Sequence, residues 1–480
     1  MFARAADAGI LEWRRRGMKI LARSALLLAA LLVVSRPAEA RLFDPQTFTL
    51  SNGMVVVVVP NHRIPIVSHM VWYKVGAADE VEGKSGLAHM LEHLMFKGTP
   101  SVPPGDFSKI VSRNGGRDNA FTSSDYTGYF QNVAADRLEL VMRMEADRMA
   151  NLTLDEDNFR TERAVVLEER RSRVGNNPAA RLAEQMEASL FLNSPYRRPV
   201  IGWESEIAGL SREDALAFYR RWYAPNNAVL VVAGDVDAET VRPLAEKYYG
   251  GLARADTPPR LRTEEPPPEA ARRVTVADPR VSQPSWSRLY LAPSQRTGES
   301  RLAQPLEVLA EIIGGGTTSI LYRSLVVDQG LAAHADAAYD PVAVGLTSFR
   351  IGVVPRPGIG LDKLEAAIER EIARIARGEI PAEEVERAKT RLRASVVYAR
   401  DSLHTGAQVL GEALAVGMAV EDVESWPDRV GAVTPAQVAE AAAKVLDARA
   451  SVTGMLLPMS GAAPVPAALP AALPVTRGIR

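Results

Sequence analysis

Two histidines and a glutamate lie within five residues of each other, in the stretch His89-Met90-Leu91-Glu92-His93. If this stretch is helical, His89 and His93 are one turn apart on the same side, and Glu92 projects beside them. Two neutral imidazoles placed in this way can bind one metal ion, and imidazole nitrogen suits Zn²⁺. Catalytic zinc usually takes three protein ligands and a water molecule, whose pKa it lowers to about 7. A neighbouring carboxylate such as Glu92 can then accept the proton of that water.

A third ligand is expected on another element, and an acidic stretch downstream supplies candidates. Residues 162–171 read Glu-Arg-Ala-Val-Val-Leu-Glu-Glu-Arg-Arg, where apolar residues between acids predict a helix that enters the core. Glu162 and Glu169 are seven residues apart and share a helix face, whereas Glu168 points about 100° away from Glu169. Spacing alone does not decide which acid binds a metal, and a solvated helix charge is the ordinary role of each.

The composition is that of an ordinary globular protein and excludes several functional classes. The 480 residues are 47% hydrophobic and 24% charged, with 57 basic and 58 acidic side chains and a net charge of −1. A nucleic-acid-binding protein would usually carry a basic excess. Because cysteine is absent, disulfides, thiolate catalysis and cysteine-bound metals are excluded. Four further histidines stand apart and are expected at the surface or in the core: His62, His69, His334 and His404.

The first forty residues have the pattern of an export signal. A basic head at residues 14–19 is followed by an apolar run at 25–34 and then by Pro37-Ala38-Glu39-Ala40. This order predicts a signal peptide over residues 1–40 that is cleaved after Ala40, and a periplasmic protein with no membrane span after cleavage. The apolar run is too short to span a bilayer as a helix. Met18 is an alternative start to Met1, and an uncleaved anchor is the alternative role of the segment.

The remainder of the chain predicts two copies of one α+β design. Ser211 with Asp214 opens a predicted helix that precedes a strand at 228–233, and Thr434 with Gln437 opens another that precedes a strand at 450–457. The two capping boxes are offset by 223 residues, a period that indicates a duplicated domain. A hairpin is predicted around residues 51–53, and a helix over residues 86–97 with Ser85 as its N-cap.

Composition divides the chain into five predicted segments. After the signal peptide come an N-terminal metal-site domain over residues 41–255 and a Pro-rich linker over 256–270. A homologous C-terminal domain over 271–460 and a flexible Ala/Pro-rich tail over 461–480 complete the chain. The second copy has no histidine in the corresponding region, residues 306–311, so one zinc ion per chain is expected.

The H-x-x-E-H order of residues 89–93, together with the Glu-Arg-x-Val-Val-x-x-Glu segment from Glu162 to Glu169, resembles the pitrilysin superfamily of zinc peptidases. In that superfamily the third ligand follows the second histidine at the spacing found between His93 and Glu169, 76 residues. The resemblance therefore implies Glu169 as the third ligand and Glu162 as the carboxylate that orients a metal-binding histidine. It also implies two homologous α+β domains that face each other across a substrate chamber.

The segment Asn119-Ala120-Phe121-Thr122, followed by Asp125-Tyr126-Thr127, resembles the substrate strand of the same superfamily. The resemblance implies that Asn119 and Ala120 bind substrate. An edge strand can accept an extended peptide as an additional strand, and main-chain pairing tolerates many sequences. The alternative role of Asn119 is to cap a turn after Gly115 and Gly116.

One departure from the family pattern concerns the second copy. Active single-chain members carry an arginine and a tyrosine seven residues apart, which contact the substrate carbonyl; here Val326 and Ala333 take their places. Neither side chain can donate a hydrogen bond to an oxyanion, and losing one such donor typically costs about 10²–10³ in rate. The resemblance therefore implies a zinc endopeptidase subunit that cleaves extended peptides in a heterodimer, with a homologous chain supplying an Arg-x₆-Tyr pair. A non-catalytic scaffold subunit is the alternative.

Overall fold

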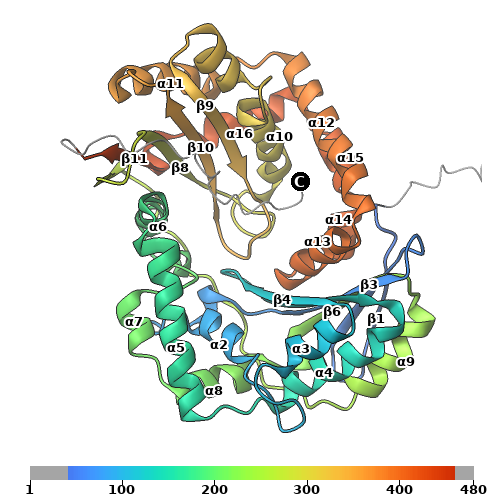
Figure 1. The fold of residues 1–480 in the computed structure, drawn as a ribbon. Helices are drawn as coiled ribbons and strands as arrows, with labels where there is room; N and C mark the ends of the chain where they lie inside the picture. Colours follow the sequence, from blue (N-terminus) through green and yellow to red (C-terminus); the bar gives the residue numbers. More distant parts are fainter. Residues whose placement is uncertain (1–41, 460–480) are drawn as a thin grey trace, which may run out of the picture. The chain divides into compact units, whose positions relative to one another are not determined.

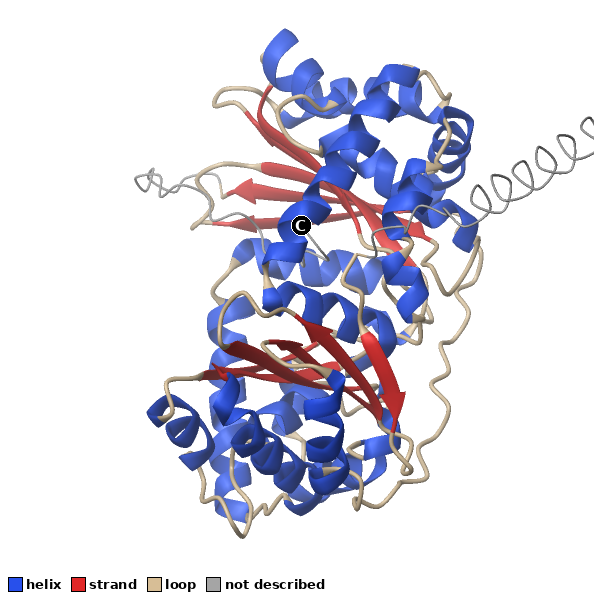
Figure 2. Ribbon diagram, turned by 90° about the vertical axis from the view of Figure 1, so that its right-hand side faces the viewer, coloured by secondary structure: helices blue, strands red, loops and turns tan. Residues whose placement is uncertain are grey.

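The computed structural model of the protein describes residues 42–459. The predicted signal peptide over residues 1–40 and the predicted tail over 461–480 lie outside these residues. Within them, the chain forms two α+β halves, and the strands of each half are gathered into one sheet with helices against it (Figures 1 and 2). No helix in this part of the chain is both long enough and apolar enough to cross a membrane.

The first half is organised by a mixed sheet with the strand order β1-β2-β6-β3-β5-β4. β2 and β6 run parallel, and the other neighbouring strands run antiparallel. The predicted turn at residues 51–53 joins β1 to β2, with Gly53 at a φ of 92° that favours glycine. The strands are β1 Gln46–Thr49, β2 Val55–Pro60, β3 Ile66–Tyr73, β4 Arg117–Thr122, β5 Thr127–Ala134 and β6 Ala228–Gly234.

Most helices of this half lie on one side of the sheet, below the strands in Figure 1, around a core rich in valine, leucine, methionine and tyrosine. They are α2 Leu87–Leu94, α3 Asp106–Arg113, α4 Leu138–Asn151, α5 Glu156–Arg170, α6 Pro178–Leu190, α7 Glu204–Ala208, α8 Arg212–Trp222 and α9 Ala238–Tyr248. Short 3₁₀ turns are η1 Ala77–Asp79, η2 Ala135–Arg137, η4 Pro195–Arg197 and η5 Pro225–Asn227, and η3 Arg171–Gly175 is π-helical.

The second half contains a sheet in the order β7-β11-β8-β10-β9. Its strands are β7 Arg272–Asp278, β8 Ser285–Ala292, β9 Ala332–Tyr339, β10 Thr347–Pro355 and β11 Ser451–Pro458. Its α-helices are α10 Ala303–Gly314, α11 Leu361–Ala376, α12 Ala382–Asp401, α13 Leu403–Ala415, α14 Val420–Glu424, α15 Trp426–Gly431 and α16 Pro435–Val445. The other helical elements are η6 Ser300–Leu302, the π-helical η7 Tyr322–Asp328 and η8 Ala448–Ala450.

The two sheets repeat one topology, which confirms the predicted duplication. In each sheet a parallel pair (β2 with β6, β7 with β11) is followed by three antiparallel pairings, and β4 and β9 occupy equivalent edges. Both predicted capping boxes form, at Ser211 before α8 and at Thr434 before α16. The strands that follow begin at residues 228 and 451, which preserves the 223-residue offset.

Each sheet also receives a helix from the other half of the chain. α13 packs on β3 and β6 of the first sheet, on the face opposite α2, α3 and α4 (Figure 1). α6 packs on β7, β8 and β11 of the second sheet, where its apolar side chains Leu182 and Met186 meet Leu289 and Val452. The two halves are therefore joined by reciprocal helix packing as well as by the chain that links them.

The Pro-rich stretch between the halves forms neither helix nor strand over residues 253–269, yet one of its side chains is firmly held. Arg262 is only 6% exposed and pairs with Asp79 at 2.7 Å and with Asp125 at 2.6 Å. The Asp125 carboxylate also accepts a hydrogen bond from the backbone of Val344, in the loop between β9 and β10, at 2.9 Å. This buried ion pair ties the linker to the turn between β4 and β5 and to the second half.

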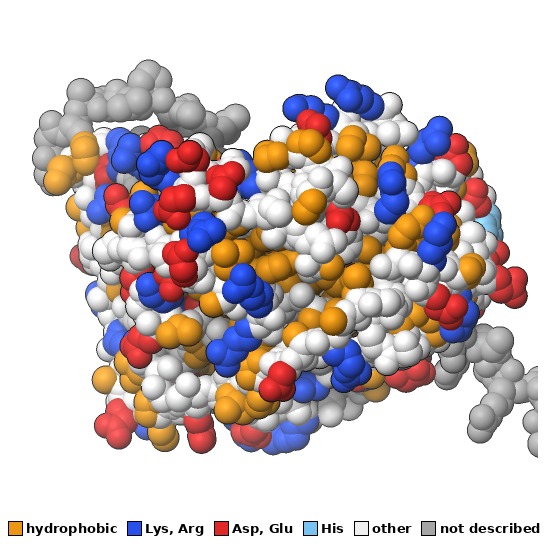
Figure 3. Space-filling model, turned by 90° about the horizontal axis from the view of Figure 1, so that it is seen from below, with side chains coloured by type: hydrophobic (Ala, Val, Ile, Leu, Met, Phe, Trp, Pro, Cys, Tyr) orange, Lys and Arg blue, Asp and Glu red, His pale blue; other side chains and the backbone are white. Residues whose placement is uncertain are grey.

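The face shown in Figure 3 mixes lysine and arginine with aspartate and glutamate over its whole area. Hydrophobic side chains lie between them. On this face the interspersed pattern agrees with the net charge of −1.

Candidate metal centre

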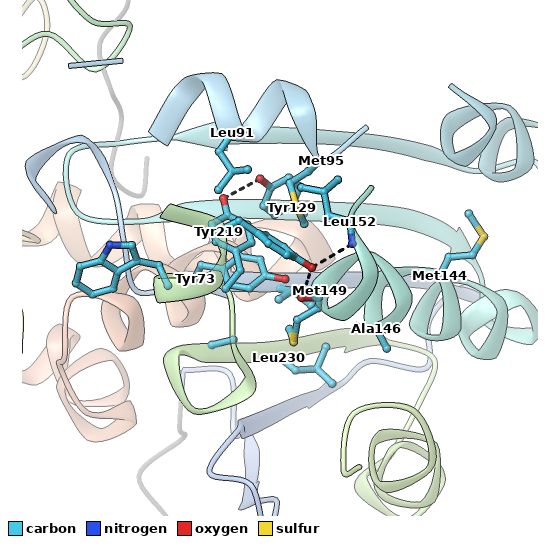
Figure 4. Close-up of a cluster of buried hydrophobic side chains, with 14 of the residues drawn as sticks. Tyr73, Leu91, Met95, Tyr129, Met144, Ala146, Met149, Leu152, Tyr219 and Leu230 are labelled. Atoms are coloured by element: carbon cyan, nitrogen blue, oxygen red, sulfur yellow. Dashed lines mark hydrogen bonds between the residues drawn. The ribbon is translucent and has the colours of Figure 1, made fainter. Parts of the chain in front are cut away.

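Helix α2 presents its polar residues on one side because its other side is anchored in the core. Leu87, Met90, Leu91 and Leu94 are almost fully buried. Leu91, together with Met95 at the end of the helix, reaches the cluster of tyrosines and methionines drawn in Figure 4. The apolar anchors fix the rotation of the helix and leave His89, Glu92 and His93 on the side that packs against α5 and β4.

The beginning of α2 differs from the prediction. Ser85 does not cap the helix; its hydroxyl accepts a hydrogen bond from the backbone of Trp203 at 2.9 Å. Gly86 at a φ of 87° precedes the first turn, and the Glu80 carboxylate accepts hydrogen bonds from Gly86 N at 3.1 Å and Ala88 N at 2.8 Å. A buried carboxylate from outside the helix thus replaces the predicted serine, and α2 ends at Leu94 rather than near Lys97.

The predicted acidic helix is α5, which begins after the N-cap Asp155 and brings two glutamates to α2. Glu162 is buried and Glu169 is 19% exposed, and both approach His93. Glu168 points away, with its side chain 65% exposed, and pairs with Arg171 at 2.8 Å. The helix therefore separates the two neighbouring acids in the way that their 100° spacing predicted.

Three side chains converge on one point. Nε2 of His93 lies 3.1 Å from Oε2 of Glu169, and Nε2 of His89 lies 3.6 Å from the same oxygen. Among the described residues, these three form the one group of at least three histidine, cysteine or acidic side chains whose ligating atoms lie within 4.8 Å of one another. His89 is 7% exposed, so two nitrogens and one oxygen meet in a largely enclosed place.

The environment of these atoms fits a cation. Oε2 of Glu169 is buried and has no hydrogen-bond partner, a situation that is costly unless another group compensates it. Burial, together with the charges of His93 and Arg173, lowers the pKa of His89 to about 3, so its imidazole is neutral. Burial by itself also lowers the pKa of His93, but its hydrogen bond to Glu162 and the charges of Glu169 and Glu162 raise that pKa overall. A neutral imidazole beside a cluster of carboxylates is a donor set that zinc favours.

Glu162 holds His93 from behind. Its Oε1 lies 2.9 Å from Nδ1 of His93, which donates a hydrogen bond to it, so Nε2 is directed towards Glu169. Lys97 pairs with the other oxygen of Glu162. Burial alone would raise the pKa of Glu162, but these two partners lower it and keep the carboxylate charged. A carboxylate in this position fixes the tautomer and the orientation of an imidazole.

Glu92 lies beside the three converging side chains and outside their group. Thr122, at the end of β4, donates a hydrogen bond from Oγ1 to Oε2 of Glu92 at 2.6 Å. Burial raises the pKa of Glu92, and the hydrogen bond from Thr122 partly opposes this effect. The sequence did not single out Thr122, because nothing in its local pattern shows a contact with a residue thirty positions earlier.

The predicted substrate strand is β4, at the edge of the first sheet. Asn119 is exposed and stands opposite Phe130 of β5, and the half-buried Ala120 stands opposite Tyr129. Asn119 therefore lies inside the strand rather than in the turn after Gly116. The second edge of β4 has no partner strand among residues 42–459.

Val326 and Ala333, the two residues of the second half that the sequence analysis compared with the family's arginine and tyrosine, have apolar side chains. Val326 is 7% exposed within η7, where it belongs to the second core. Ala333 is exposed on β9, which is the edge strand that corresponds to β4. α10 takes the place of α2 between β8 and β9, and its sequence contains no histidine.

Comparisons with known proteins agree with this duplicated fold. Residues 55–203 match the family profile described as "Insulinase (Peptidase family M16)", and residues 209–392 match "Peptidase M16 inactive domain". A curated relative from Helicobacter pylori, named "Zinc protease PqqE", is 32% identical over 397 residues, which cover 82% of this chain and 87% of the relative. The chain belongs to peptidase family M16, within the pitrilysin superfamily.

Other relatives and solved structures are similar over most of the chain. An "Uncharacterized zinc protease" of Streptomyces coelicolor is 28% identical over 84% of this chain and 88% of its own length. The crystal structure of a protease from Helicobacter pylori has a TM-score of 0.80 at 30% identity and covers 86% of this chain and all of that one. The first half of the periplasmic protease PqqL from Escherichia coli has a TM-score of 0.72 at 21% identity, over 86% and 92% of the two chains, and shares the fold.

Proposed function

We propose that the protein is a zinc metalloendopeptidase subunit, with His89, His93 and Glu169 as zinc ligands and Glu92 as general base. The observation that carries the proposal is the convergence of two imidazole nitrogens on a buried carboxylate oxygen that has no hydrogen-bond partner, with a second carboxylate beside them. The curated relatives that bear the name zinc protease support the metal and the reaction class. Each chain would bind one zinc ion, because the second half has no histidine at the matching helix.

Each residue of the site would have a separate role in peptide hydrolysis. A bound zinc ion would supply Lewis-acid activation of water and of the scissile carbonyl. Glu92 would accept the proton of the attacking water, and Thr122 would hold the carboxylate in place for that transfer. Glu162 would keep His93 oriented. The open edge of β4, at Asn119 and Ala120, would bind an extended peptide by main-chain hydrogen bonds.

A partner subunit is the second element of the proposal. Val326 and Ala333 cannot stabilise an oxyanion, so a homologous chain would supply an arginine and a tyrosine to a shared chamber. The fold of this chain corresponds to 92% of the first half of the E. coli PqqL protease but to 47% of the complete PqqL chain. That larger protein thus extends well beyond one unit of this size, which supports pairing of two such units.

Export to the periplasm is proposed from the signal pattern in residues 1–40. The E. coli protease PqqL, which shares the fold, is itself described as periplasmic, and this agrees with the proposal. A non-catalytic scaffold subunit is the competing function, and the family profile matched by the second half is itself described as inactive. The complete set of converging side chains in the first half favours catalysis, because a scaffold has no need for them.

Metal content together with peptide cleavage tests the proposal. The purified protein should contain one zinc per chain, and His89→Ala, His93→Ala and Glu169→Gln should each remove most of it. Glu168→Gln is the matched control, since this neighbouring glutamate is exposed and pairs with Arg171, and it should retain zinc. Full zinc occupancy in all three ligand variants, measured by elemental analysis, would refute the assignment.

A further inference from the structure

Only one of the two carboxylate oxygens of Glu169 faces the histidines, and the other oxygen forms an ion pair with an arginine. Nη2 of Arg173 lies 2.8 Å from Oε1 of Glu169, while Oε2 faces the two histidines. Arg173 follows Glu169 by four residues, but it does not belong to α5. It lies in the π-helical segment η3, in which Asn176 N donates to Arg171 O at 2.8 Å. Single π-helical turns of this kind occur frequently at functional sites.

The contact with Arg173 determines what Glu169 can do. A free carboxylate beside a divalent cation can bind through one oxygen or through both. The guanidinium of Arg173 pairs with Oε1 as an ion pair and leaves Oε2 to face the imidazoles. Coordination through one oxygen keeps the number of protein donor atoms at three, which is the arrangement that leaves a fourth position for water.

On this basis we propose that Arg173 is a positioning residue, which restricts Glu169 to a one-oxygen mode of metal binding. The inference rests on the proposed function, because it assumes that His89, His93 and Glu169 hold zinc. It goes beyond it, since Arg173 touches neither the metal position nor the base.

A neighbouring ion pair provides an internal comparison. Arg171 pairs with Glu168 at 2.8 Å, and its side chain is 62% exposed, against 71% for Arg173. Both arginines belong to η3, and both pairs join η3 to the last turn of α5. Because both arginine side chains are largely exposed, loss of either should affect folding only slightly. Only loss of Arg173 should change how the site binds a metal ion.

The test compares Arg173→Ala, Arg173→Lys and Arg171→Ala in the full chain. Zinc affinity is measured by competition with a chelator, and the visible spectrum of the cobalt-substituted protein reports the coordination number. Arg173→Ala should bind zinc about tenfold more weakly, the lower end of the range for residues behind a ligand, and should weaken the cobalt bands as coordination rises. Arg173→Lys should recover part of both properties, and Arg171→Ala should match the wild type.

Two different failures can be told apart in this experiment. If Arg173→Ala and Arg171→Ala have the same zinc affinity and the same cobalt spectrum as the wild type, Arg173 has no positioning role, while the zinc site itself stands. If the wild-type protein binds no zinc, the proposed function is wrong and the role of Arg173 falls with it. Thermal unfolding of the three variants shows whether a loss of affinity comes from a loss of folded protein.

Discussion

At the scale of single residues, α2 places two neighbouring side chains in different environments. Glu92 is half-buried near Tyr129 and receives a hydrogen bond from Thr122, whereas His93 donates to Glu162 on α5. The two residues are adjacent in sequence, yet Glu92 is held by the edge strand β4 and His93 by helix α5. This separation allows proton transfer and metal binding to be changed independently.

The first prediction uses that independence. Glu92→Gln keeps the size and the hydrogen-bond acceptor of the side chain but cannot accept a proton, so turnover should fall by about 10²-fold or more. Zinc content should equal that of the wild type, because Glu92 lies outside the converging group. Peptide hydrolysis and elemental analysis of the same sample check both statements. A zinc-loaded Glu92→Gln protein with normal turnover would contradict the assigned base.

The residues that sequence reasoning found and missed differ in a physical way. His89, Glu92 and His93 are arranged by helix geometry alone, so their spacing was sufficient to predict a common side. The contact between Thr122 and Glu92 joins residues that are distant in sequence. The cap that Glu80 provides for α2 depends on the irregular turn between Glu80 and the helix. Such contacts depend on how the strand and the helix pack, and the local pattern does not contain that information.

At the scale of elements, two glycines allow the reciprocal helices to approach their sheets. A methyl group on Gly411 of α13 would lie 2.0 Å from Nε1 of Trp72, and one on Gly454 of β11 would lie 2.1 Å from Sδ of Met186 on α6. The sequence predicted the hairpin around residues 51–53, both capping boxes and the strands that follow them. It did not predict which sheet each helix covers, because an apolar face does not identify its partner.

Substitution of these glycines is therefore expected to destabilise the fold unequally. Gly411→Ala should lower the free energy of unfolding by about 1–3 kcal/mol, because the rigid and buried Trp72 cannot move aside. Gly454→Ala should cost less, since the end of the Met186 side chain is flexible. Gly360→Ala, with no heavy atom within 4 Å of the added methyl group, is the control. Denaturant unfolding measures the order, and equal stabilities for all three variants would contradict the packing argument.

At the scale of the whole molecule, a buried carboxylate joins the halves and makes their contact sensitive to pH. Tyr126, which precedes β5, donates a hydrogen bond to Oε1 of Glu412 on α13 at 2.7 Å. Burial raises the pKa of Glu412 far above its ordinary value of 4.5, and the nearby charge of Asp340 raises it further. The folded protein therefore holds this proton more tightly than the unfolded chain does.

The pH dependence of stability follows from that difference. The protonated Glu412 contributes fully to the free energy of unfolding below its ordinary pKa. This contribution is lost as the pH rises towards the higher pKa of the folded state. Glu412→Gln carries no titrating proton, so its melting temperature relative to the wild type should rise between about pH 5 and about pH 8. Glu421→Gln, at an exposed position on α14, is the control for the removal of one negative charge. A difference for Glu412→Gln that stays constant with pH would disprove the linkage.

The last prediction concerns the partner subunit. The packing around Val326 explains why this chain could not easily supply the missing arginine itself. Val326 is packed in the second core, so an arginine at that position would bury a charge, although Ala333 is exposed on the β9 edge. We therefore expect the purified chain to cleave peptides weakly, and an exported homologue that lacks H-x-x-E-H and carries Arg-x₆-Tyr to raise the rate about 10²-fold or more. Alanine in place of the partner's arginine should abolish that gain without changing the zinc content of this chain. Full peptidase activity of the chain alone would show that the missing contacts come from elsewhere.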